Sequence, residues 1–244
     1  MGSTERVAIV TGGSRGIGRA VAERLAADGQ AVVVNYAGNE EAARETVEAI
    51  TARGGRAVAV RGDVGDEAAV KALFDAAEEH FGGVDVVVNS AGIMALSPVA
   101  QLDLAELDRI HRTNVRGAFA VAREAANRVR QGGAVVLFST TVTKTNLPTY
   151  AAYAASKAAV ETLVPILAKE LAGKDVTVNA VAPGPTATEL FLNGKSDELV
   201  AKLAAQNPMG RLGAPEDIAE VVSALAGGAR WVNAQTVFVN GGLA

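Results

Sequence analysis

Short apolar runs alternate along the chain with longer segments rich in alanine, glutamate and arginine. The runs cover residues 6–11, 31–36, 57–62, 84–89, 134–139, 176–181 and 235–240, and most are apolar throughout. Continuous apolar runs of this length are typical of strands covered on both faces, as in a parallel sheet. The segments between them predict helices near residues 16–28, 40–54, 67–81, 104–130, 150–172 and 215–227.

Repeated alternation of strand and helix predicts an α/β fold with a doubly wound, mainly parallel seven-stranded sheet and helices on both faces. No proline-rich linker or block of charge divides the chain, so we expect one domain over residues 1–244. Residues 185–214 break the rhythm and are richer in glycine, proline, asparagine and threonine. An insertion of this kind near the strand ends is a candidate lid over a substrate site.

Composition excludes several classes of function. The net charge of −4 without a basic stripe argues against nucleic acid or an anionic membrane surface as a partner. The absence of cysteine excludes disulfides, zinc-thiolate sites and thiol nucleophiles, and we expect no metal site. The first residues lack the pattern of a secretory leader, and no run of 18 apolar residues occurs. We therefore expect a cytoplasmic protein that acts on a small molecule.

The first apolar run leads directly into a glycine-rich turn, TGGSRGIGRA, at residues 11–20. Gly12, Gly16 and Gly18 stand where a strand passes into a helix, and glycines there permit positive φ and let backbone amides approach a pyrophosphate. A tight turn without a ligand is the alternative. Strand, glycine turn and helix at the start of an alternating α/β chain nevertheless favour a single-domain Rossmann fold that binds a dinucleotide.

The second apolar run ends at Asn35-Tyr36, about 20 residues beyond the turn, where an NAD-preferring site places an acid for the ribose 2′-hydroxyl. No acid stands there, and Arg15 in the turn is available to pair with a 2′-phosphate. We therefore predict NADP(H) in preference to NAD(H), with a solvated surface arginine as the alternative. Asp63 is expected to accept a hydrogen bond on the adenine side or to cap the following helix.

Short motifs follow one another in order along the chain. They are TGGSRGIG at 11–18, Asp63-Val64, NSAG at 89–92, Asn114, Ser139, YAASK at 153–157 and PGPTAT at 183–188. Each motif is modest alone, but the ordered set is specific. It resembles the short-chain dehydrogenase/reductase family over essentially the whole chain, with a closer likeness to its carbonyl reductases and 3-oxoacyl-[acyl-carrier-protein] reductases.

By that resemblance, Asn114, Ser139, Tyr153 and Lys157 form a catalytic tetrad, and residues 183–188 contact the nicotinamide end of the cofactor. The predicted cofactor-binding residues are Gly12, Ser14, Arg15, Gly16, Ile17, Gly18, Asn35, Tyr36, Ala37, Asp63, Val64, Asn89, Ala91, Gly92, Tyr153, Lys157, Pro183, Gly184, Thr186 and Thr188.

The hydroxyl of the tetrad has more than one candidate. The family's usual pair of serines ahead of the tyrosine is Ser139-Thr140-Thr141 in this chain. We choose Ser139 because it lies at the strand end. Its spacing to Tyr153 also matches family members that carry a proline before the tyrosine, as Pro148 does here.

Carbonyl reduction by hydride transfer places negative charge on the carbonyl oxygen, and a proton must arrive there. A free tyrosine has a pKa of about 10, so only about one in a thousand is ionised at neutral pH. An ammonium about 5 Å away supplies about 3 kcal/mol toward a lower pKa at an effective dielectric constant near 20. On a helix Lys157 stands one turn from Tyr153 and two turns from Tyr150. We therefore predict that Lys157 lowers the pKa of Tyr153, with Ser139 holding the substrate oxygen and Asn114 orienting the lysine.

The leading hypothesis is an NADPH-dependent oxidoreductase that reversibly reduces a ketone, an aldehyde or a 3-oxoacyl thioester to the alcohol, with the tyrosine as general acid and base. A wider tyrosine-lysine spacing resembles enoyl-thioester reductases, so an enoyl reductase that uses Tyr150 is the second hypothesis. A nucleotide-binding regulator without turnover is the third, because a fold does not imply a function.

The substrate itself is not encoded in a recognisable motif. We expect Leu190, Phe191, Leu192 and Met209 to form an apolar wall, and residues 187–206 to be a mobile lid. The resemblance implies a homotetramer, or a dimer, assembled through the long helices. Trp231, which precedes the last apolar run, is expected to serve packing.

Overall fold

The structure is a computed structural model, and it describes residues 5–244. Its centre is a seven-stranded sheet in which all neighbouring strands are parallel, in the order β3-β2-β1-β4-β5-β6-β7. The strands are β1 (Val7–Thr11), β2 (Ala31–Tyr36), β3 (Ala57–Arg61), β4 (Val84–Asn89), β5 (Val129–Phe138), β6 (Thr177–Pro183) and β7 (Thr236–Val239). The predicted doubly wound sheet is confirmed.

Helices fill the connections between the strands. The longer ones are α1 (Gly16–Ala27), α2 (Glu40–Thr51), α3 (Glu67–Phe81), α4 (Leu104–His111), α5 (Gly117–Arg128), α7 (Ala151–Glu170), α9 (Asp197–Ala205) and α10 (Pro215–Ala226). Short helical turns are η1 (Val99–Gln101), α6 (Val142–Thr145) and α8 (Glu189–Leu192). The single helix predicted over 104–130 is instead two helices, α4 and α5, joined by the π-helical turn η2 (Arg112–Arg116). Turns of this kind frequently occur at functional sites.

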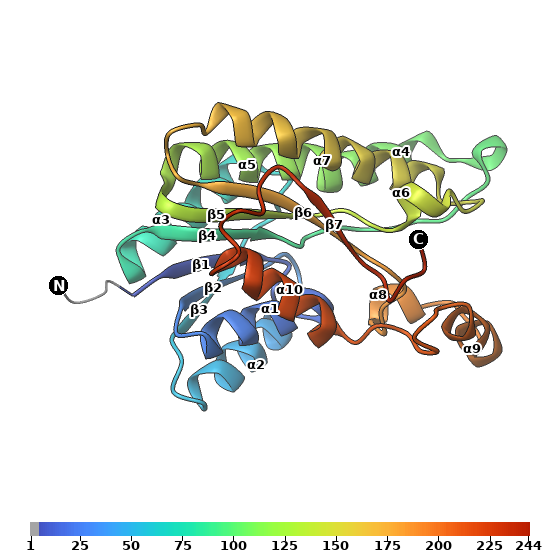
Figure 1. Cartoon of the computed structure of the whole chain (residues 1–244), viewed down its shortest axis with the longest axis horizontal. Coiled ribbons are helices and arrows are strands. Elements are labelled where there is room, and N and C mark those ends of the chain that lie inside the picture. Colours follow the sequence, from blue (N-terminus) through green and yellow to red (C-terminus); the bar gives the residue numbers. More distant parts are fainter. Residues whose placement is uncertain (1–4) are drawn as a thin grey trace.

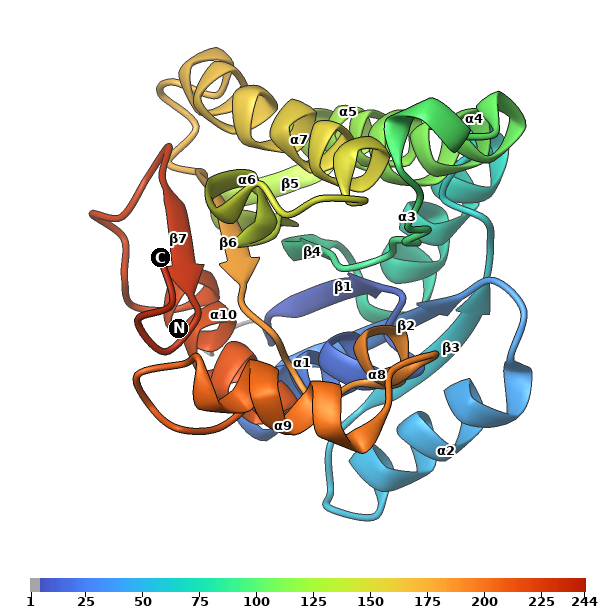
Figure 2. The ribbon, with the colours of Figure 1, turned by 90° about the vertical axis from the view of Figure 1, so that its right-hand side faces the viewer.

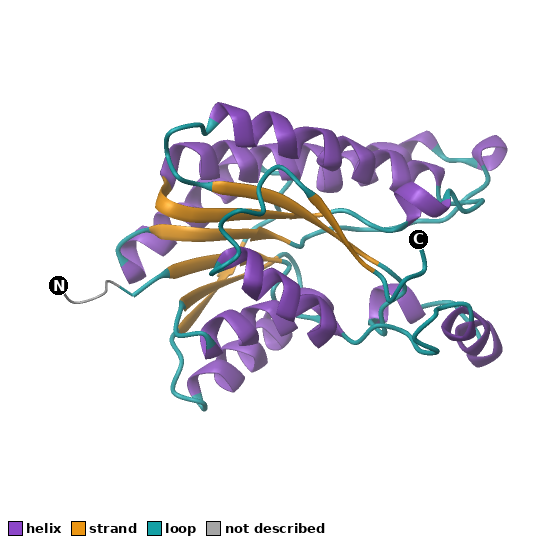
Figure 3. Cartoon of the chain, in the orientation of Figure 1, coloured by secondary structure: helices purple, strands orange, loops and turns teal. Residues whose placement is uncertain are grey.

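The sheet is covered on both faces, with α3, α5 and α7 on one side and α1, α2 and α10 on the other (Figures 1 and 3). Val7 and Ile9 of β1 belong to the apolar core beneath α3, α5 and α7. Ala8 and Val10 belong to the core beneath α1 and α10. Successive side chains of a strand point to opposite faces, so a strand that is apolar throughout fills both cores.

The functional end of the sheet follows from the strand order. β1 and β4 are neighbours, and from them the chain continues outward in opposite directions, to β2 and β3 on one side and to β5, β6 and β7 on the other. In a doubly wound sheet such a reversal opens a crevice at the carboxyl ends of the strands. Figure 2 views the molecule from this end, where α8 and α9 lie in front of the sheet.

Candidate active site

The glycine turn after β1 has a backbone that other residues would not tolerate. Gly12 has a φ of 62° and Gly16 a φ of 52°, both in the left-handed region. A Cβ on Gly18 would lie 2.2 Å from the carbonyl oxygen of Gly12, and one on Gly12 would lie 3.0 Å from the Cα of Ala91. The first turn of α1 reads Gly-Ile-Gly-Arg without an acidic residue. Its free N–H groups therefore favour an anionic ligand.

A cavity of about 740 Å³ opens from this turn along the carboxyl ends of the strands. Of the predicted site residues, it is lined by Gly12, Ser14, Arg15, Gly16, Ile17, Gly18, Asn35, Tyr36, Ala37, Asp63, Val64, Ala91, Gly92, Ser139, Tyr153, Lys157, Pro183, Gly184, Thr186 and Thr188. The fold thus brings together residues separated by more than 170 positions. Asn89 and Asn114 lie behind the cavity wall.

Asn89 supports the wall rather than forming it. The hydroxyl of Thr11 donates a hydrogen bond to Asn89 Oδ1 over 2.8 Å, and the backbone N–H of Ala91 donates to the same hydroxyl over 3.1 Å. The two residues are also partners in the register of β1 and β4. Asn89 and Thr11 therefore hold the loop after β4 against the glycine turn.

Asn114 is buried in the π-helical turn, and its side-chain amide is fully engaged. Its Oδ1 accepts the N–H of Ile93 over 2.9 Å, and its Nδ2 donates to the carbonyl oxygen of Ile93 over 2.9 Å and to Ser156 Oγ over 3.0 Å. Ser156 in turn donates to the backbone carbonyl of Tyr153 over 2.7 Å. Asn114 thus joins the loop after β4 to α7, and its Oδ1 and the Nζ of Lys157 lie on either side of Gly92.

Tyr153 and Lys157 lie one turn apart on α7, and burial governs both. Burial raises the pKa of Tyr153 to about 12, against a lowering by its hydrogen bond with Thr140, and the nearby Tyr150 raises it further. Burial lowers the pKa of Lys157 to about 8. The lysine Nζ lies 5.9 Å from the centre of the Tyr153 ring and donates to the carbonyl oxygen of Phe138 over 2.9 Å.

The predicted lowering of the Tyr153 pKa by Lys157 is therefore wrong for the protein without a ligand. Burial disfavours the charged form of either group, which raises the pKa of a phenol and lowers that of an amine. At Tyr153 burial outweighs the hydrogen bond with Thr140, which works to lower the pKa. The sequence spacing was sufficient to place the two groups but not to establish how deeply they are buried.

The two hydroxyls that follow β5 have different partners. Ser139 Oγ donates to Glu161 Oε1 on α7 over 2.5 Å, and Thr143 Oγ1 donates to the same oxygen over 2.8 Å. Thr140 instead hydrogen-bonds with the side chain of Tyr153. The run of three hydroxyl residues pointed to this place, but sequence reasoning missed Glu161, which carries no motif.

Ion pairs lie at the part of the cavity that Arg15 and Asp63 line. Arg15 Nη1 lies 3.1 Å from Glu189 Oε2, and both side chains are largely exposed. Asp63 accepts the N–H of Gly65 over 2.8 Å and a hydrogen bond from Arg112 over 2.6 Å. Burial works to raise the pKa of Asp63, but the Gly65 N–H and Arg112 outweigh it and hold that pKa below its usual value. Asp63 is therefore an ionised acceptor.

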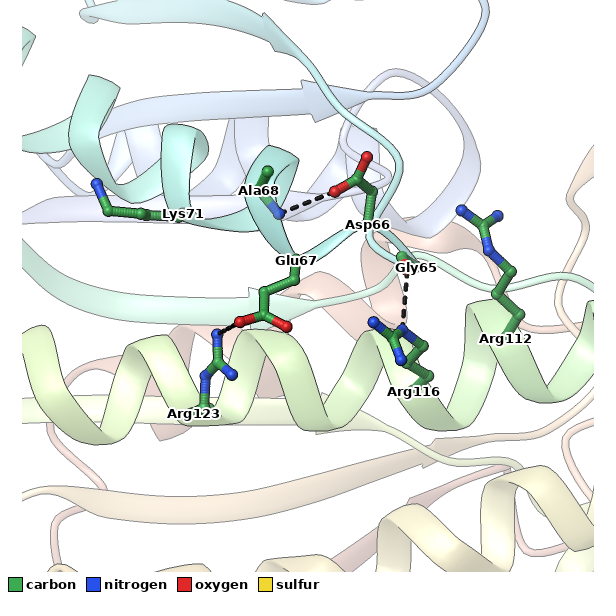
Figure 4. Close-up of a pocket in the computed structure, with 8 residues that line it drawn as sticks. All are labelled: Gly65, Asp66, Glu67, Ala68, Lys71, Arg112, Arg116 and Arg123. Atoms are coloured by element: carbon green, nitrogen blue, oxygen red, sulfur yellow. Dashed lines mark hydrogen bonds and ion pairs between the residues drawn. The ribbon is translucent and has the colours of Figure 1, made fainter.

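A second hollow lies beside the start of α3, next to the loop that carries Asp63 (Figure 4). Arg116 Nε donates to the carbonyl oxygen of Gly65 over 3.2 Å, and Arg123 pairs with Glu67 over 2.7 Å. Arg112 borders both this hollow and the main cavity. The π-helical turn therefore holds the loop after β3 through Arg112 and Arg116, and it holds α7 through Asn114.

The opposite end of the cavity is mostly apolar. Its lining there includes Ile93, Met94, Val142, Leu147, Tyr150, Leu190, Phe191, Leu203 and Leu243. Leu190 and Phe191 thus lie where the sequence predicted them, whereas Leu192 and Met209 do not line the cavity. Met209 is 63% exposed, because the chain has already left the cavity when it reaches this residue. The remaining apolar residues come from loops far apart in sequence, and no local pattern indicates them.

Across residues 5–244, we find no cluster of histidine, aspartate or glutamate side chains suited to a metal ion. In the same range, no helix combines the length and the apolar character needed to cross a membrane.

Comparisons with known proteins match the chain over nearly its full length. A family described as "Enoyl-(Acyl carrier protein) reductase" matches residues 12–244. The chain is 47% identical over 252 residues to "NADPH-dependent aldehyde reductase-like protein, chloroplastic" of Arabidopsis thaliana, covering 97% of this chain and 93% of the relative. It is 44% identical over 250 residues to the versicolorin reductase stcU of Emericella nidulans, covering 97% and 95%.

Solved structures agree with these relatives. A short-chain dehydrogenase/reductase from Serratia marcescens superimposes with a TM-score of 0.93 at 35% identity, covering 98% of each chain. A blue fluorescent protein from a metagenomic library, solved in complex with NADPH, superimposes with a TM-score of 0.91 at 34% identity, covering 98% of each chain.

Proposed function

Because the chain belongs to the short-chain dehydrogenase/reductase family, we propose that it is an NADPH-dependent oxidoreductase that reversibly reduces a ketone or an aldehyde to the alcohol. One observation carries this proposal. Tyr153, Lys157 and Thr140 meet in the same cavity that the glycine turn opens. Carbonyl reduction requires a proton donor beside a site for a hydride donor, and this cavity offers room for both.

The residues present fit NADPH. The glycine turn leaves no room for side chains where a pyrophosphate would approach the start of α1. Arg15 is exposed, and the end of β2 carries Asn35-Tyr36 rather than an acidic residue. Residues 183–188 would hold the nicotinamide end. When bound, the cofactor supplies the hydride. The names of the Arabidopsis relatives and the NADPH complex of the blue fluorescent protein support this choice.

Tyr153 is the proton donor to the substrate oxygen in the reduction direction. With a pKa of about 12 the phenol is fully protonated at neutral pH, which is the form that a donor needs. With a pKa of about 8, Lys157 carries a proton in about nine molecules of ten at pH 7. Its ammonium stabilises the phenolate that forms as the proton leaves, and a hydroxyl of the Ser139-Thr140 pair holds the substrate oxygen.

An enoyl-thioester reductase is the second candidate. Tyr150 also lines the cavity, and the matching family carries the description of an enoyl reductase. The relatives named as aldehyde and versicolorin reductases favour the carbonyl reaction. The substrate end is apolar, so we expect a carbonyl carried on an apolar or aromatic body.

Oxidation of NADPH by the purified protein, followed with ketones, aldehydes, 3-oxoacyl thioesters and enoyl thioesters, tests the proposal. Turnover of carbonyl compounds that is lost in Tyr153→Phe would support it. Turnover of enoyl thioesters alone would transfer the function to the second candidate. Tight NADPH binding without turnover on any compound would favour a nucleotide-binding regulator.

We also propose a homotetramer built through α5 and α7. Phe119 on α5 and Ile166 on α7 are 50% and 49% exposed, which a partner helix would cover. Trp231, expected to serve packing, is fully exposed in the single chain, beside the edge strand β7. Sedimentation velocity measures the assembly, and Phe119→Glu should dissociate it. The cytoplasmic location stays a prediction, since two plant relatives are named as chloroplastic.

A further inference from the structure

We propose that Thr140, rather than Ser139, supplies the hydroxyl that holds the substrate oxygen beside Tyr153, and that Ser139 forms a structural tie with Glu161. The proposal rests on the carbonyl reduction proposed above. Both residues are buried, and both border the cavity, so exposure does not distinguish them. Their hydrogen bonds do.

The hydroxyl proton of Ser139 is already donated in a hydrogen bond to Glu161. A carboxylate only accepts hydrogen bonds, so the 2.5 Å contact with Glu161 requires Ser139 Oγ to be the donor. Thr143 donates to the same carboxylate oxygen over 2.8 Å. To hold a substrate oxygen, Ser139 would have to break this charge-assisted bond and leave the carboxylate with one hydroxyl fewer.

The pleat of β5 explains why Ser139 meets Glu161. Leu137 packs into the core on the α7 side of the sheet, and Ser139 lies two residues later. Its backbone N–H still pairs with the carbonyl oxygen of Val181 over 2.8 Å, so the ladder to β6 continues through this residue. Side chains two apart on a strand point to the same face. Ser139 therefore points at α7, where Glu161 lies one turn beyond Lys157.

Thr140 is the second residue beyond the end of β5, and it lines the same cavity as Tyr153, whose pKa it works to lower. Its Oγ1 accepts the N–H of Val142 over 3.3 Å, and its own proton faces the neutral hydroxyl of Tyr153 rather than a carboxylate. That proton is available to a carbonyl oxygen that also receives the proton of Tyr153. Two donors from Thr140 and Tyr153 then converge on one oxygen, as stabilisation of a developing oxyanion requires.

Four single variants test the assignment with saturating NADPH and the best carbonyl substrate of the panel. Thr140→Val removes the hydroxyl and keeps the shape, and it should lower kcat by about 10²–10³-fold with unchanged NADPH binding. Thr140→Ser restores the hydroxyl and should regain activity to within about tenfold of the parent. Thr140→Ala replaces Thr140→Val in the comparison if the valine variant does not fold.

Ser139→Ala and Glu161→Gln should retain kcat to within about tenfold and lower the Tm instead, by about 2–4 °C. The Tm losses should fall short of additivity in the double variant, because both changes remove the same hydrogen bond. A large loss of kcat in Ser139→Ala with a competent Thr140→Val would return the role to Ser139. Comparable losses of kcat in Ser139→Ala and Thr140→Val would show that both hydroxyls hold the substrate oxygen. Either result overturns the proposal. Full activity of Tyr153→Phe would instead defeat the proposed function itself.

Discussion

The catalytic floor and the cap above it are built in different ways. We define the catalytic floor as the end of β5, the turn η2 and the helix α7, and the cap as residues 185–214 with α8 and α9. In the floor, Asn114, Ser139 and Lys157 are at most 5% exposed, and each is hydrogen-bonded. In the cap, neither α8 nor α9 has a buried residue among the positions that the structure describes.

This difference suits the floor to holding the reacting groups and the cap to admitting and selecting the substrate. A buried and fully hydrogen-bonded floor holds reacting groups in place before the substrate arrives. A cap with little buried apolar surface opens at a low free-energy cost. The cap is anchored where it returns to the sheet, since Asn207 Nδ2 donates to the carbonyl oxygen of Asn240 over 2.6 Å and its Oδ1 accepts the N–H of Met209 over 2.8 Å. We therefore expect motion between residues 187 and 206, with the anchor retained.

The largest effect should come from the floor. Tyr153→Phe should lower kcat by about 10²–10⁴-fold while NADPH binding persists, because only the proton-donating hydroxyl is removed. Tyr150→Phe, the matched control, should change mainly the Michaelis constant, since Tyr150 lines the cavity but stands two helical turns from Lys157 rather than one. The assignment would be reversed by an inactive Tyr150→Phe alongside a Tyr153→Phe that still reduces enoyl thioesters.

The second effect is a pH dependence of stability. The folded pKa of Lys157 is about 8, below the value of 10.5 for a free lysine, so between these pH values the unfolded chain holds a proton that the folded protein has lost. Stability of the cofactor-free protein should therefore rise with pH across this window, by up to about 3 kcal/mol from this group. Lys157→Met should lack the rise, which denaturant titrations of both proteins at pH 7.5 and 10 would measure. Parallel pH profiles would show that Lys157 is not destabilised by burial.

A moderate effect should appear in the cap. Trypsin should cut the cofactor-free protein after Lys195 or Lys202, both within the expected mobile segment, and NADPH with a substrate should slow this cleavage. Lys71, on α3 and exposed like Lys202, serves as a control site outside the cap. Equal cleavage of the cap with and without ligands would remove the case for a lid.

The smallest effect concerns the exposed ion pair that connects the cap to the glycine turn. Arg15→Ala should weaken NADPH binding about 2- to 5-fold and leave NADH binding almost unchanged, in keeping with the modest strength of exposed ion pairs. Glu189→Gln should tighten NADPH binding slightly, because it frees Arg15 from its partner on α8. Fluorescence titrations with both cofactors measure these shifts at low and high salt. An equal loss for both cofactors in Arg15→Ala would make Arg15 a general phosphate contact.

By itself the sequence determined the order of strands and helices, the glycine turn and the one-turn spacing of Tyr153 and Lys157. These are local properties: a run such as residues 84–89 is apolar throughout, and the spacing along a helix follows from its geometry. The start of β5 at Val129 was missed, because pairing with Val84 on β4 decides it rather than the helical pattern that precedes it.

Only the tertiary structure decided the partners of the polar side chains and the direction in which the pKa values of Tyr153 and Lys157 shift. Ser139 and Thr140 are adjacent in sequence, yet one meets Glu161 and the other Tyr153, because the end of β5 turns them apart. Burial by distant elements set the pKa of Tyr153 against the direction that spacing alone predicted. Hydrogen-bond direction and burial depend on atoms that the fold brings together from separate parts of the chain, and no local pattern specifies them.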